Sequence, residues 1–228
     1  MSLIFLDIET IPCNDNKVIE QLQDAITPPG NITKDETKLK WLEQNLEAEL
    51  DKAVRKTALD GLYGQILSIS WAIDDSEIYS VFRSSYDDSE ARLLDDFFYG
   101  LDNYHDHNGQ RVGISKWVGH FLTGFDLRFI WQRCVINRVK PTIAIPYDAK
   151  PWDDRVFDTK IAWTGNGQYS GSGSLDKLSL VLLGEGKGDI NGANVYDYFI
   201  EGAIDKIVEY NKKDVEMCRN LYKRMNFL

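Results

Sequence analysis

The sequence has few cysteines, no long apolar run and fewer basic than acidic residues. Its cysteines, Cys13, Cys134 and Cys218, are odd in number and widely spaced, which argues against a disulfide framework or a zinc cluster. No apolar run approaches the roughly 18 to 20 residues that a membrane span requires. The first residues, MSLIFLDIET, lack the basic leader of a secretory signal. These absences predict a cytoplasmic protein that does not act in a membrane.

The net charge is −10 at pH 7, which matters because nucleic acid is a polyanion. An acidic protein is a poor candidate for tight, non-specific binding to a duplex. The charge is unevenly distributed, however. Residues 74–106 carry ten Asp or Glu, whereas residues 111–140 carry six Lys or Arg against Asp126 alone. This pattern is compatible with a local contact between the basic segment and the end of one nucleic-acid strand.

Apolar periodicity predicts an α/β domain with a mixed central β-sheet flanked by helices. Strands are expected at 2–9, 66–73, 78–82 and 116–121. Helices are expected at 88–102, 125–137, 175–183 and 203–225. We interpret residues 1–228 as a single domain.

Two stretches fall outside this alternation of strands and helices. Residues 14–60 contain a Pro-Pro-Gly turn and then a charged segment with leucines four residues apart, which predicts a helical insertion. This insertion is a candidate surface for a protein partner. Residues 164–174 (TGNGQYSGSGS) are rich in Gly and Ser, which predicts a loop because such residues bury little surface.

The first candidate site residues are Asp7 and Glu9, at the end of an apolar strand. Side chains two residues apart on a strand project from the same face. Two buried carboxylates side by side are unfavourable unless a cation neutralises them. Hard oxygen ligands favour Mg²⁺ or Mn²⁺. The alternative is a strand end that faces solvent and holds no metal.

Two further elements carry acidic residues. Asp126 follows Phe125 where a strand leads into a helix, and its carboxylate could simply complement the positive helix N-terminus. Tyr210 and Asp214 are four residues apart on the last helix and therefore share a face. That pair could also be an ordinary hydrogen bond between packed elements. The combination of all three elements is much more specific than any one of them.

Taken together and in this order, Asp7/Glu9, Asp126 and Tyr210/Asp214 resemble the three motifs of the DEDD exonuclease superfamily in its tyrosine branch. That branch includes ribonuclease D and the proofreading domains of family A and family B DNA polymerases. Residues 174–185 resemble the segment before the third motif in the family B-like group. Residues 57–66 resemble phage- and prophage-encoded exonucleases of that group. The resemblance implies a ribonuclease H-like fold.

The resemblance also implies a mechanism with two divalent cations, Mg²⁺ or Mn²⁺. Asp7 would bridge both ions, Glu9 and Asp214 would complete the first site, and Asp126 would hold the second ion largely through water. Tyr210 would orient the attacking water. The expected activity is removal of nucleoside 5′-monophosphates from the 3′ end of nucleic acid, with single-stranded DNA as the favoured substrate.

Contacts with the substrate are expected from Thr10, His120, Phe125 and Lys213. For two of them a structural role is the alternative, because an aromatic residue at a helix start often belongs to the core and His120 is not where the histidine branch carries its histidine. Among other functions, a ribonuclease D-like exoribonuclease is the main alternative. A non-catalytic nucleic-acid-binding domain and a phosphodiesterase acting on very short oligonucleotides are further alternatives.

Overall fold

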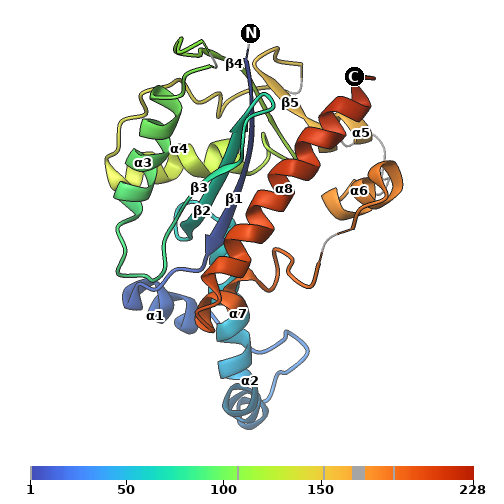
Figure 1. Ribbon diagram of the computed structural model, residues 1–228. Helices are drawn as coiled ribbons and strands as arrows, with labels where there is room; N and C mark the ends of the chain where they lie inside the picture. Colours follow the sequence, from blue (N-terminus) through green and yellow to red (C-terminus); the bar gives the residue numbers. More distant parts are fainter. Residues whose placement is uncertain (1, 107, 151, 166–172, 187) are drawn as a thin grey trace.

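The computed structural model describes residues 2–106, 108–150, 152–165, 173–186 and 188–228. These residues form a five-stranded sheet in the order β3-β2-β1-β4-β5 (Figure 1). The strands are β1 (Ser2–Ile11), β2 (Gln65–Ile73), β3 (Tyr79–Phe82), β4 (Ile114–Gly119) and β5 (Val156–Asp158). The central strand β1 is antiparallel to β2 and parallel to β4, so the predicted mixed sheet is confirmed.

The helices agree with the predicted ones where the sequence periodicity is long. They are α1 (Asn16–Asp24), α2 (Asp35–Lys56), α3 (Glu90–Asp102), α4 (Asp126–Asn137), α5 (Thr159–Thr164), α6 (Leu175–Leu183), α7 (Val195–Ile200) and α8 (Ile204–Met225), with a 3-10 helix at Thr57–Leu59. The unpredicted elements α5, α7 and β5 have six, six and three residues, too few for a periodic pattern to reveal them, and α1 lies inside the predicted helical insertion at 14–60. The loop predicted at 164–174 lies largely outside the described residues, because 166–172 are not among them.

The alternation of side chains along β1 separates the two faces of the sheet. Ile4, Leu6 and Ile8 belong to the main core, which also contains the buried residues of α3 and α4. Phe5 instead packs with Val215 of α8. Figure 1 shows α8 crossing this second face of the sheet. The odd-numbered residues of β1 therefore lie under α8.

Helix α8 is buried along the face that contacts β1 and β2. Asn211, Asp214, Val215 and Cys218 on this face are all buried, at the spacing of three and four residues that aligns side chains on a helix. An apolar face of this kind would be expected to bury only hydrophobic side chains. The polar residues in the middle of it, Asn211 and Asp214, are therefore candidate functional residues.

The insertion after β1 contains α1 and α2, neither of which buries a residue. Figure 1 shows α2 extending away from the sheet. The two ends of the insertion meet, because the backbone N–H of Cys13 donates to Thr57 Oγ1 at 2.8 Å. Arg55 near the end of α2 forms an ion pair with Asp197 of α7. None of the described helices is both long enough and apolar enough to cross a membrane.

Candidate active site

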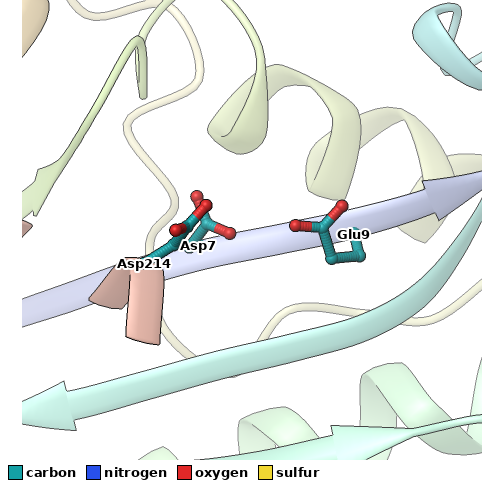
Figure 2. A group of neighbouring side chains, drawn as sticks. All are labelled: Asp7, Glu9 and Asp214. Atoms are coloured by element: carbon teal, nitrogen blue, oxygen red, sulfur yellow. The ribbon is translucent and has the colours of Figure 1, made fainter. Parts of the chain in front are cut away.

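Three carboxylates converge where α8 crosses β1. Asp7 and Glu9 from β1 and Asp214 from α8 each present an oxygen, and these oxygens lie within 4.8 Å of one another (Figure 2). Glu9 and Asp214 are buried and Asp7 is half-buried. Such a concentration of negative charge away from water is unfavourable without a cation. Three hard oxygen donors suit Mg²⁺ or Mn²⁺, so the donor set fits the predicted metals.

The neighbouring strand leaves room for these carboxylates. In the β1–β2 register, Ser70 lies opposite Asp7 and Ser68 lies opposite Glu9. Both serines are fully buried. Their small side chains allow α8 to pack closely over the strand pair, which brings Asp214 to β1. The register shifts between Glu9 and Thr10, so the regular alternation of faces ends just after the second carboxylate.

A buried polar chain, which no local sequence pattern predicts, positions Asp7. The Asn211 side-chain amide donates to Asp7 Oδ2 at 2.7 Å, and Ser68 Oγ donates to Asn211 Oδ1 at 3.0 Å. Asn211 and Ser68 are both fully buried. The hydrogen bond from Ser68 fixes the amide so that its NH₂ group, not its oxygen, faces Asp7. This chain holds one oxygen of Asp7 and favours the ionised form of the carboxylate.

We expect Asn211→Leu to weaken Mg²⁺ binding and lower kcat by about 10- to 100-fold each, the usual effect of removing a group that orients a metal ligand. Isothermal titration calorimetry gives the metal affinity and a strand-shortening assay gives kcat. Asn226→Leu, at an exposed position just after α8, is the matched control and should change neither value. A folded Asn211→Leu protein with the wild-type affinity for Mg²⁺ would contradict this role.

Asp126 lies next to this group but is not one of the three. It begins α4, is buried, and its Oδ1 accepts the backbone N–H of Ile8 at 3.1 Å, between the two carboxylate residues of β1. Burial, with smaller contributions from the nearby Asp158 and Asp214 carboxylates, raises the pKa of Asp126 to about 8. Hydrogen bonds from backbone N–H groups act in the opposite direction. A cation nearby would favour the ionised form.

Tyr210 lies beside the carboxylates, as its position on α8 predicts. The phenol is hydrogen bonded to Asp214, and burial is the main cause that raises its pKa above the usual value. The charges of Glu9, Asp214 and Asp7 raise the pKa further, since each disfavours a phenolate. The hydroxyl is therefore protonated at neutral pH and can orient a water molecule by a hydrogen bond.

The four predicted substrate contacts occupy different surroundings. Thr10 donates its hydroxyl to the Ala58 carbonyl at 2.7 Å, and His120 Nδ1 lies 3.0 Å from Thr159 Oγ1. Phe125 is half-buried and packs against the main core. Lys213 is exposed, with its Nζ donating to a backbone carbonyl, and it lines an open cavity of about 580 Å³ that also borders Tyr210. Of the four, Lys213 is the one that lines this cavity.

Comparisons with known proteins bear on this site. No curated protein matches the chain. The structure is similar to that of the family B DNA polymerase from the hyperthermophilic archaeon Pyrobaculum calidifontis, with a TM-score of 0.58 and 14% identity. The similarity covers 99% of this chain and 24% of the polymerase chain, so this chain spans about a quarter of that protein. The shared architecture confirms the ribonuclease H-like α/β fold.

A protein family described as a predicted 3′–5′ exonuclease related to the exonuclease domain of PolB matches residues 59–228. The match includes Asp126, Tyr210 and Asp214. The matched segment begins after α2, so it does not include Asp7 and Glu9. These two residues come from β1, which pairs with β2 inside the matched segment. Exonucleases of this kind act on nucleic acid and use divalent metal ions. Because the match covers more than half of the chain, the protein belongs to this family of predicted PolB-related 3′–5′ exonucleases.

Proposed function

We propose that the protein is a two-metal-ion exonuclease of the tyrosine branch of the DEDD superfamily. It would remove nucleoside 5′-monophosphates from the 3′ end of single-stranded DNA. The observation that carries this proposal is the convergence of Asp7, Glu9 and Asp214 within 4.8 Å. Two of these carboxylates come from the first strand and the third from the last helix, so their meeting is a property of the fold and not of local sequence.

In this proposal Asp7, Glu9 and Asp214 hold one Mg²⁺ or Mn²⁺ ion, and Asp7 and Asp126 hold a second. When bound, two such ions stabilise charge on the scissile phosphate and activate the attacking water. Asn211 keeps Asp7 oriented toward the ions. Tyr210 orients the water, since its raised pKa makes the phenol a poor base. Lys213, at the edge of the site, would contact the phosphate backbone.

DNA is the proposed substrate because the matching family is related to the exonuclease domain of PolB. Discrimination between DNA and RNA depends on contacts with the 2′-hydroxyl, so an RNA arm of the assay decides the ribonuclease D-like alternative. We propose that the insertion at 14–60 binds a protein partner, since α1 and α2 bury none of their residues. The resemblance of residues 57–66 favours a phage or prophage origin.

The test is incubation of the purified protein with 5′-labelled single-stranded DNA, or RNA of the same sequence, and Mg²⁺ or Mn²⁺. We expect a ladder that shortens from the 3′ end of DNA and disappears with EDTA. Asp7→Ala should show no ladder. Asp35→Ala is the matched control, because the Asp35 side chain is 94% exposed on α2, and it should behave as wild type. A folded protein that shortens neither strand with either metal would refute the proposal.

A further inference from the structure

The loop between β4 and α4 contains an aromatic side chain in a strained backbone conformation. Phe121 has φ of 61°, in the left-handed region that a bulky residue other than glycine seldom adopts. Its side chain is also exposed, at 42% of its full surface. Strain of this kind is found preferentially where a side chain must be held in place for binding or catalysis. Neither core packing nor local conformational preference explains a phenylalanine here.

Three neighbours hold Phe121 in this position. Asp158 at the end of β5 accepts the backbone N–H of Phe121 at 2.9 Å and both the N–H and the hydroxyl of Thr123. Lys160 Nζ lies 3.9 Å from the centre of the Phe121 ring. The ring also covers Gly124, where a Cβ atom would lie 2.4 Å from the ring. The loop is therefore built to present this ring.

The loop that presents Phe121 also borders the carboxylate site. It ends at Asp126, whose carboxylate is hydrogen bonded to β1 and feels the charges of Asp158 and Asp214. At its other end, Gly119 lies so close to the Leu6 carbonyl that a Cβ atom there would be 2.9 Å from it. The second aromatic residue of the loop, Phe125, is half-buried, and its ring centre lies 5.2 Å from the ring centre of Phe129. Phe121 is thus the more exposed of the two aromatic rings of this loop, with Lys160 over one of its faces.

We propose that Phe121 stacks on a base close to the 3′ end of the bound strand, with Asp158 and Lys160 fixing the ring. This inference rests on the proposed function, because it takes the ligand to be single-stranded nucleic acid. An aromatic ring accepts any base, since every base has a π face. Such a contact would allow an acidic protein to bind one strand end without an extended basic surface.

The test compares Phe121→Asn with Phe121→Trp. Asparagine tolerates the left-handed conformation, so Phe121→Asn should keep or raise the unfolding midpoint while it removes the ring. We expect it to raise the KM for single-stranded DNA by about 10- to 100-fold, with a smaller effect on kcat. Phe121→Trp should retain the wild-type KM. Tyr99→Ala on α3, where Tyr99 is 69% exposed, is the control and should retain it too.

Two readouts separate this inference from the proposed function. Fluorescence anisotropy with labelled single-stranded DNA in EDTA measures binding without cleavage, and Phe121→Asn should weaken it to a similar extent. With a strand whose 3′-terminal nucleotides are abasic, wild type and Phe121→Asn should bind equally. The stacking role would be overturned if Phe121→Asn bound the normal strand as tightly as wild type does. It would also be overturned if Phe121→Asn lost as much affinity for the abasic strand as for the normal one. A wild-type protein that binds DNA through Phe121 but never shortens it would refute only the exonuclease proposal.

Discussion

Replacing Asp214 by Asn is expected to lower kcat by about 10³-fold or more. The change keeps the shape of a buried side chain and removes one negative charge from three carboxylates that lie within 4.8 Å. A metal ion contributes several kcal/mol of transition-state stabilisation, and about 4 kcal/mol corresponds to 10³-fold in rate. The single-turnover rate of 3′ shortening at saturating Mg²⁺ is the measurement.

The same variant should have an opposite effect on stability without metal. In EDTA the three carboxylates repel one another, so Asp214→Asn should raise the thermal unfolding midpoint. The increase in midpoint that Mg²⁺ gives the wild type should largely disappear. Asp205→Asn, at an exposed position on the same helix, is the matched control for both measurements. An Asp214→Asn protein that is still stabilised by Mg²⁺ and still active would exclude Asp214 as a ligand.

Replacing Arg133 by Met is expected to lower the free energy of unfolding by about 3–5 kcal/mol, the usual loss when one partner of a buried ion pair is removed. Arg133 on α4 and Glu90 at the start of α3 are both buried, with Nη2 and Oε2 2.6 Å apart. Glu90 also accepts the backbone N–H of Ile66 at 2.7 Å and the side-chain amide of Asn137. Without Arg133, the Glu90 charge would be buried without its cation.

Urea denaturation at equilibrium measures this loss. The matched control is Arg155→Met, because Arg155 pairs with Asp153 through the same two-point contact but is 55% exposed. Exposed pairs contribute about 0–1 kcal/mol, so the control should unfold close to wild type. An equally small effect for Arg133→Met would show that the pair contributes to the arrangement of α3 and α4 but little to net stability.

Local patterns were enough to predict that most residues of the candidate site share a face of their strand or helix. Two-residue spacing placed Asp7 and Glu9 on one face of a strand, and four-residue spacing placed Tyr210 and Asp214 on one face of a helix. These rules depend only on the geometry of the element that carries the residues. The long helices α3, α4 and α8 were predictable for the same reason, because their apolar periodicity extends over several turns.

Contacts between distant elements were not predictable in this way. The hydrogen bond between Ser68 and Asn211 joins residues 143 positions apart, and nothing in either local sequence signals it. Asp126 was recognised as a candidate, yet its contact with the Ile8 backbone depends on where β4 ends beside β1. The role proposed for Phe121 depends on its left-handed backbone and on the hydrogen bond of its N–H to Asp158 of another strand, and local sequence reveals neither.

The arrangement of β1 and α8 determines when the site can form during synthesis. Asp7 and Glu9 are made early, but Asn211, which orients Asp7, follows 204 residues later and Asp214 just after it. A nascent or prematurely terminated chain that lacks α8 therefore holds Asp7 and Glu9 on a strand without Asp214. Such a fragment should bind divalent metal weakly. Metal binding by this cluster of carboxylates therefore depends on the synthesis and docking of α8.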